Sequence, residues 1–160
     1  MYWGPLKGIL LTPRRAPFHA AFVALPDKPQ ITLSFQKILL QYVAYGFAVM
    51  IIEPFGYLPY NQQKDQDLAS DLSRRRQKNI AQDIQQCFDF IENKFPQITH
   101  FILAGWGVGG LWSYRISSLL DKVNATVTYY SNPNLMMDGI YSSHKPYFGV
   151  FTTPSEDPSK

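Results

Sequence analysis

The stretch LAGWGVGGLW, residues 103–112, places four glycines within six residues. An apolar run, THFILA (99–104), precedes the glycines, and a segment with helical spacing, residues 108–121, follows them. Two known motifs have this strand–turn–helix form: the dinucleotide-binding fingerprint G-x-G-x-x-G and the nucleophile elbow G-x-S-x-G. If the stretch is an elbow, Gly107 stands where the nucleophile should be.

Apolar runs elsewhere in the chain have the length of strands, and most are continuous rather than alternating. Continuous apolar runs are typical of strands that are buried on both faces of a sheet. The runs that predict strands are GILLT (8–12), AAFVAL (20–25), FAVMII (47–52), ATVTYY (125–130) and YFGVFT (147–152).

Helical segments alternate with these strands. Residues 34–46 have helical apolar spacing, with Ser34 as the expected N-cap and Gly46 as the stop signal. A longer helix is predicted from Asp67 to Phe95, where Pro96 ends it. The alternation predicts an α/β fold with a mostly parallel sheet and helices on both faces, formed by residues 1–160 as a single domain.

Composition excludes several classes of function. The formal net charge is only +3, and acidic residues surround the basic cluster Arg74–Arg76, so nucleic-acid binding is not expected. No apolar run approaches the 18 or so residues of a transmembrane helix. The single cysteine, Cys87, falls on the apolar side of a helical repeat, which predicts a buried thiol in a reducing compartment. We expect an intracellular protein, with the cytoplasm favoured over the mitochondrion.

Gly105, Gly107 and Gly110 satisfy the dinucleotide fingerprint. Two features weigh against this interpretation. The next strand, ATVTYYSNPN, ends without the acidic residue that would hold a ribose, and at least three predicted strands precede the motif although it usually follows the first. Dinucleotide binding therefore stays open as a minor alternative.

Several segments in order along the chain support the elbow interpretation. They are GILLTPRRAPFHAAFVALPD, LLQYVAYGFAVMIIEPFG, DIQQCFDFIENKF with its Asp83, ATVTYYS and HKPYFGVFTTPSEDP. With these segments, the chain resembles the dienelactone hydrolase family of α/β-hydrolases, in which the elbow reads Gly-x-Cys-x-Gly-Gly. The resemblance implies an incomplete α/β-hydrolase fold that is degenerate and truncated at its C-terminus.

A hydrolase of this kind needs a nucleophile and a histidine base. Gly107 has no side chain, and its neighbours Trp106 and Val108 are not nucleophiles. The three histidines, at positions 19, 100 and 144, each precede a predicted strand. They should therefore lie at the opposite edge of a parallel sheet from the elbow, roughly 16–20 Å away at about 3.3 Å per residue.

Glycine at position 107 has a physical consequence for the turn. An elbow holds its tip residue at positive φ, which costs a non-glycine residue about 1–3 kcal/mol. Glycine adopts this conformation without that cost. We therefore expect Gly105, Gly107, Gly109 and Gly110 to keep the shape of an elbow without its chemistry.

The resemblance also suggests remnants of the family's other site residues. Asp157 is similar to the catalytic acid, with Glu156 as plausible in register. The loop VALPDK is similar to one that carries a histidine–glutamate or glutamine–glutamate pair in relatives, and here Pro26 and Asp27 occupy it. Two interpretations stay open for Asp27: a carboxylate retained near the elbow, or a turn residue between two prolines.

These observations predict a non-catalytic protein, a pseudoenzyme that works as a structural or interaction subunit of a larger assembly. Its expected contact surface is the C-terminal sheet edge, with Tyr147, Phe148, Val150 and Phe151. One alternative is a module that binds a carboxylate or lactone through the amides near Gly107. A more remote alternative is an active hydrolase whose base comes from another chain. No cofactor and no metal are expected.

Overall fold

The computed structural model describes residues 2–3, 6–14, 17–27, 31–53, 74–131 and 145–151. Within these residues the chain forms seven strands and three helices. The strands are β1 (Tyr2–Trp3), β2 (Leu6–Leu11), β3 (Ala20–Leu25), β4 (Ala48–Glu53), β5 (His100–Trp106), β6 (Val123–Tyr129) and β7 (Tyr147–Val150); the helices are α1 (Leu33–Ala44), α3 (Arg74–Lys94) and α4 (Val108–Ser117).

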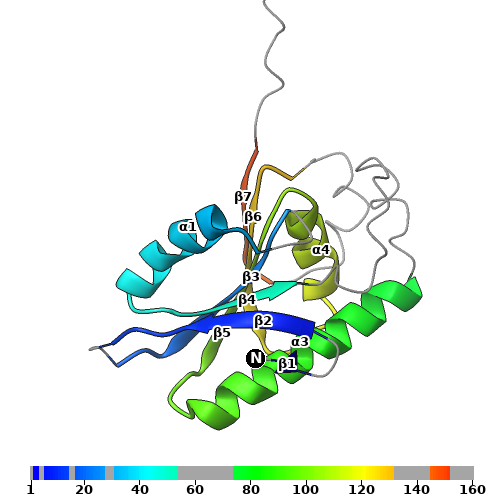
Figure 1. Ribbon diagram of the computed structural model, residues 1–160. Coiled ribbons are helices and arrows are strands. Elements are labelled where there is room, and N and C mark those ends of the chain that lie inside the picture. Colours follow the sequence, from blue (N-terminus) through cyan, green and yellow to red (C-terminus); the bar gives the residue numbers. More distant parts are fainter. Residues whose placement is uncertain are drawn as a thin grey trace, which may run out of the picture.

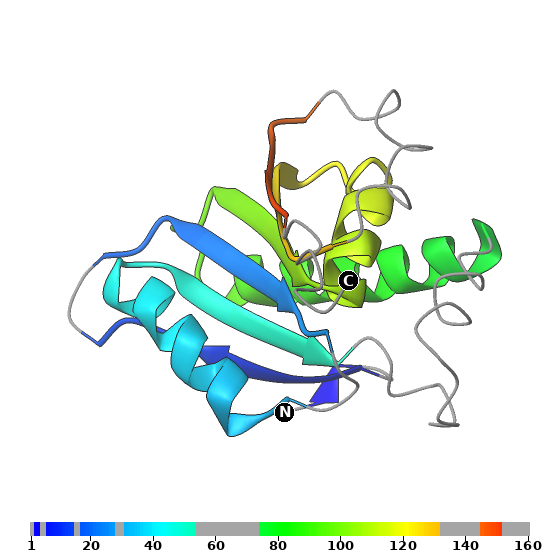
Figure 2. The ribbon, with the colours of Figure 1, turned by 90° about the horizontal axis from the view of Figure 1, so that it is seen from above.

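The described strands form one sheet in the order β1-β2-β4-β3-β5-β6-β7. The five neighbouring strands β4, β3, β5, β6 and β7 run parallel to one another. Strand β2 is antiparallel to β4, and β1 is antiparallel to β2. Helix α1 covers one face of the sheet, and α3 and α4 cover the other (Figures 1 and 2). The predicted α/β architecture, a mostly parallel sheet between helices, is confirmed.

Alternate residues of the central strands supply the two cores. Val23 and Leu25 of β3 pack toward α3 and α4, whereas Phe22 and Ala24 pack toward α1. All four side chains are buried. Because both faces of the strand are covered, the run AAFVAL has no polar residue, which is why it reads as continuous rather than alternating.

Helix α1 begins two residues earlier than the predicted N-cap requires. Thr32 caps it, and its Oγ1 accepts a hydrogen bond from the Phe35 backbone N–H at 3.2 Å. The prediction of Ser34 as the cap is therefore wrong, because that residue lies inside the helix while Thr32 offers the same hydroxyl at the boundary. The stop at Gly46 is correct, since this glycine has a φ of 91° just beyond the helix.

Several predicted boundaries shift by a few residues. Helix α4 ends at Ser117 rather than 121, and β6 covers Val123–Tyr129 rather than 125–130. The long helix predicted from Asp67 is described from Arg74 onward, and its first predicted residues lie outside the described part of the chain. None of the described helices is both long enough and apolar enough to cross a membrane.

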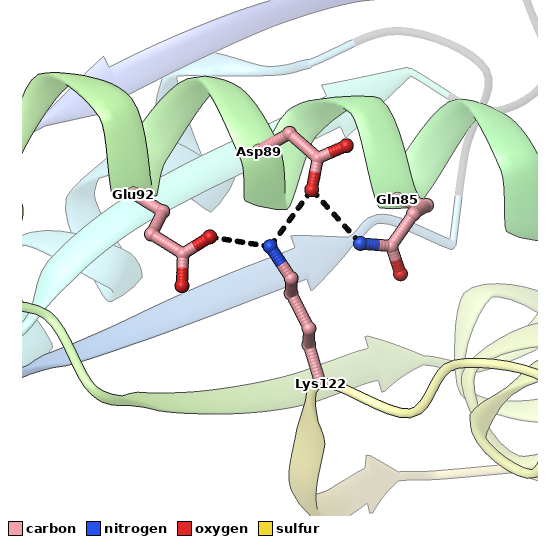
Figure 3. Close-up of polar contacts among 4 residues, drawn as sticks. All are labelled: Gln85, Asp89, Glu92 and Lys122. Atoms are coloured by element: carbon pink, nitrogen blue, oxygen red, sulfur yellow. Dashed lines mark hydrogen bonds and ion pairs between the residues drawn. The ribbon is translucent and has the colours of Figure 1, made fainter.

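An ion-pair cluster ties α3 to the start of β6 (Figure 3). Lys122 Nζ donates to Asp89 Oδ1 at 2.8 Å and also to the carboxylate of Glu92, and Gln85 donates to the same Asp89 oxygen at 2.9 Å. The hydrogen bond from Lys122 lowers the pKa of Asp89, and the hydrogen bonds to Asp89 and Glu92 raise the pKa of Lys122.

We expect Lys122→Met to destabilise the protein by at most about 1 kcal/mol, because the pair is partly exposed and screened by salt. The lowered pKa of Asp89 means that its contribution is present above 3.8 and is lost as the pH falls through the folded value. The raised pKa of Lys122 means that its contribution is lost only as the pH rises beyond 10.5. Urea unfolding at several pH values, with Lys37→Met on α1 as control, should show a difference that disappears in acid.

Candidate functional site

The glycine-rich stretch forms a sharp turn between the end of β5 and the start of α4. Gly107 lies at the tip with a φ of 51° and a ψ of −116°, so the predicted positive φ is present. Its backbone N–H donates to the Tyr129 carbonyl at 2.8 Å, and its carbonyl accepts from Ser131 Oγ at 2.9 Å. The turn is therefore held from the neighbouring strand β6 and has the strand–turn–helix form of a nucleophile elbow.

The other three glycines of the stretch are required by close packing. A Cβ at Gly105 would stand 2.2 Å from the Gly109 carbonyl oxygen. A Cβ at Gly109 would stand 2.3 Å from the Leu25 carbonyl oxygen, and one at Gly110 would stand 1.9 Å from Ser131 Oγ. Internal backbone and side-chain contacts thus account for the glycines, with no need of a dinucleotide.

Asp27, which follows β3, reaches the tip of the turn. Its Oδ1 accepts a hydrogen bond from the Val108 backbone N–H at 3.0 Å, and a Cβ placed on Gly107 would stand only 2.0 Å from the same oxygen. In an elbow, the N–H of the residue after the nucleophile is one donor of the oxyanion hole. The Asp27 carboxylate therefore fills the space of a side chain at position 107 and engages the donor beside it.

The described histidines lie at the opposite edge of the sheet. His19 precedes β3, with its Nδ1 3.2 Å from the Gln97 carbonyl oxygen, and His100 opens β5, with its Nδ1 2.8 Å from Thr99 Oγ1. Along β5 the elbow is about 20 Å away at about 3.3 Å per residue. The predicted placement of these two histidines is correct, and His144 lies outside the described residues.

An aromatic cluster beside the elbow was not predicted from the sequence. The Trp106 ring stacks on Tyr129, with ring centroids 4.7 Å apart, and meets the Phe35 ring edge-on at 4.9 Å. The Tyr42 and Tyr129 hydroxyls are 2.8 Å apart, and burial raises the pKa of Tyr42. These contacts join α1 to the ends of β5 and β6, and no local sequence pattern could indicate them because the partners are far apart in the chain.

Cys87 lies on the buried side of α3, and burial together with the nearby Asp83 raises the pKa of its thiol to about 12. Because the thiolate is the reactive form, we expect this cysteine to resist a disulfide reagent such as 5,5′-dithiobis(2-nitrobenzoate) in the folded protein. After unfolding in guanidinium, one equivalent of the reagent should react per chain, because the chain has a single cysteine. Rapid reaction before unfolding would show that the thiol is accessible.

Asp157 and its neighbour Glu156, the expected remnants of the catalytic acid, lie outside the described residues. Among the residues that the structure does describe, no three or more histidine, cysteine, aspartate or glutamate side chains gather as a metal site would require. The described part of the site thus consists of the turn, the Asp27 carboxylate and the aromatic cluster.

The model of the dienelactone hydrolase family matches residues 6–158 of this chain. A comparison with curated proteins gave no match.

Solved structures share the fold. A Klebsiella pneumoniae protein assigned as a dienelactone hydrolase superposes with a TM-score of 0.69 at 9% identity, over 92% of this chain and 80% of its own. Est1E from Butyrivibrio proteoclasticus superposes with a TM-score of 0.56 at 13% identity, over 79% of this chain and 46% of its own. A serine hydrolase homologue from Coxiella burnetii superposes with a TM-score of 0.58 at 13% identity, over 91% of this chain and 67% of its own. The chain therefore spans about half the length of Est1E, and these identities show the fold alone.

Proposed function

The chain belongs to the dienelactone hydrolase family, and from this premise we propose that it keeps the family's fold without its catalysis and serves as an interaction subunit of a larger protein assembly. We further propose that it works inside the cell, with the cytoplasm favoured, since a single buried cysteine suits a reducing compartment.

The observation that carries the proposal is the state of the elbow tip. Covalent catalysis at an elbow needs a side-chain nucleophile, and Gly107 supplies none. Any neighbouring group would also need the oxyanion donor, and the Val108 N–H is already bonded to Asp27. Both requirements of acyl transfer are thus unmet at the place where the family performs it.

The position of the described histidines supports the same proposal. His19 and His100 lie at the edge of the sheet away from the elbow, about 20 Å along β5 at about 3.3 Å per residue. A general base must come within hydrogen-bonding distance of the proton that it accepts. Neither histidine meets this condition at position 107.

The elbow also bears on the alternative of a carboxylate- or lactone-binding module. Such a ligand would use the first free N–H groups of α4, where the helix dipole favours negative charge. The Asp27 carboxylate already takes the Val108 N–H and would repel a second anion. This competition favours the interaction role over the binding module.

Exposed aromatic side chains near β7 support an interaction surface. In the described part of the sheet β7 is an outer strand, and a strand with an unpaired edge can bind another chain. Phe148 is 61% exposed, Tyr147, Phe151 and Tyr130 are also exposed, and Val150 is half-buried. Tyrosine and other aromatics are common anchors of protein interfaces.

Affinity purification of the tagged chain from its own cells tests the interaction role. We expect the wild-type chain to elute from sizing chromatography within a larger complex, and Phe148→Asp to elute without its partner. Tyr45→Asp is the matched control, because this aromatic residue is 82% exposed but follows α1. A wild-type chain that is monodisperse at the size of one copy, or a complex that tolerates Phe148→Asp, would contradict the proposal.

A further inference from the structure

We propose that Asp27 is an intramolecular plug of the elbow, which closes it to esters and small carboxylates. The plug is a single carboxylate. It occupies the place of a side chain at position 107, and it accepts a hydrogen bond from the neighbouring Val108 N–H. The inference rests on the proposed function only in that position 107 carries no nucleophile.

The distances make the plug and a side chain at position 107 mutually exclusive. A Cβ on Gly107 would lie 2.0 Å from Asp27 Oδ1, 2.6 Å from its Cγ and 3.3 Å from its Cβ. The first distance is little more than a covalent bond, so a residue larger than glycine must displace the carboxylate. Glycine at 107 and aspartate at 27 are therefore a coupled pair.

The chemistry of the carboxylate explains why it fits this place. The tetrahedral intermediate of acyl transfer carries a negative oxygen that an elbow stabilises with backbone N–H groups at a helix N-terminus. Asp27 Oδ1 is a negative oxygen bonded to the first N–H of α4, a helix of 10 residues. The protein itself supplies the anion that a substrate would otherwise develop there.

The backbone that carries Asp27 is firmly packed. Leu25 is fully buried, and the carbonyl oxygens of Leu25 and Pro26 would lie within 2.5 Å of a Cβ on Gly109. The end of β3 therefore rests directly on the first turn of α4. This close contact fixes the backbone just before Asp27 over the start of α4, and the exposed carboxylate reaches the Val108 N–H from there.

Gly107→Cys, with and without Asp27→Ala, tests the plug by installing a nucleophile. With p-nitrophenyl acetate the introduced thiol loses its proton to water, its sulfur forms a bond to the acetyl carbonyl carbon, and p-nitrophenolate leaves with the electron pair of the broken C–O bond. Because the Cβ of the introduced cysteine must itself displace the Asp27 carboxylate, we expect the burst to be about equally fast in Gly107→Cys with and without Asp27→Ala. Peptide mass spectrometry should place the acetyl group at position 107.

Two controls belong to this experiment. Asp121→Ala in the Gly107→Cys background removes another exposed carboxylate, close to the far end of α4, and should leave the burst rate unchanged. Cys87 is buried in the native chain and should stay unmodified in every variant. A burst that Asp27→Ala speeds about 100-fold, the size of the effect of one oxyanion donor, would show that the carboxylate still engages the Val108 N–H beside a side chain at position 107, and would overturn the mutual exclusion.

A second measurement keeps glycine at position 107, so it does not depend on the folding of the Gly107→Cys chain. Hydrogen exchange of the Val108 amide should become at least about 10-fold faster in Asp27→Ala, because a hydrogen bond to a charged group is lost. Asp27→Asn, which retains an acceptor oxygen, should keep most of the protection. Equal exchange in all three chains would contradict the plug. Neither readout involves a partner, so a failed partner purification would leave this result standing, and the reverse also holds.

Discussion

Gly109→Ala should destabilise the protein by about 3 kcal/mol or more, since overpacking of a tight site typically costs 1–3 kcal/mol and here the neighbours are backbone atoms. The added Cβ would lie 2.3 Å from the Leu25 carbonyl oxygen and 2.5 Å from that of Pro26. Neither atom can move aside like the end of a flexible side chain. The end of β3 and the first turn of α4 must therefore separate, which loosens the elbow itself.

Thermal unfolding measures this effect. For a chain of this length, about 3 kcal/mol corresponds to a fall in the melting temperature of roughly 6–12 °C. Gly46→Ala is the matched control, because Gly46 has a φ of 91° but no atom within 4 Å of an added Cβ. The Gly46→Ala variant should be destabilised only by backbone strain, and by less than Gly109→Ala. Equal melting temperatures for Gly109→Ala and the wild type would show that β3 and α4 are not in close contact.

Phe88→Ala should lower the free energy of unfolding by about 3–5 kcal/mol, the usual cost of removing a fully buried phenylalanine. Phe88 of α3 is 0% exposed, and its ring centroid lies 4.7 Å from that of Phe101 on β5. The cavity would open between the helix and the strand that leads into the elbow. The substitution therefore tests whether α3 covers this face of the sheet as described.

Urea unfolding provides the measurement, with Phe90→Ala as the control on the same helix. Phe90 is only half-buried, so its truncation should cost about 1 kcal/mol. A similar loss for both variants would mean that α3 does not present Phe88 to the core.

The central strands β3, β4 and β5 could be predicted from the sequence because each of them is mostly buried on both faces. AAFVAL was assigned to residues 20–25 and forms β3 at those residues, since a buried run bounded by a proline leaves little choice. The order of strands could not be predicted in the same way. β4 lies between β2 and β3, and β1 pairs with β2, through contacts that no single segment encodes.

The candidate site was predictable in its backbone and not in its contacts. The glycines of residues 105–110 predict a tight turn by their spacing alone, and positive φ at Gly107 follows from the elbow geometry. The sequence allows two interpretations of Asp27, because its partner Val108 is 81 residues away. The stacking of Trp106 on Tyr129 is non-local in the same sense, so periodicity gave no signal for it.

The coupling of Gly107 and Asp27 gives the proposed loss of catalysis a physical basis. Glycine removes the strain of about 1–3 kcal/mol that an elbow imposes on another residue. It also leaves room for the Asp27 carboxylate, which bonds the Val108 N–H.

Ester hydrolysis by the purified native chain shows whether the elbow retains any catalysis. With p-nitrophenyl acetate in excess over the protein, we expect a rate equal to that of the same buffer containing the unfolded chain. We expect the same result for Asp27→Ala, because removing the plug does not supply a nucleophile at Gly107. Multiple turnovers by the native chain, abolished by Asp27→Ala while the fold persists, would contradict the claim that the elbow has kept its shape and lost its chemistry.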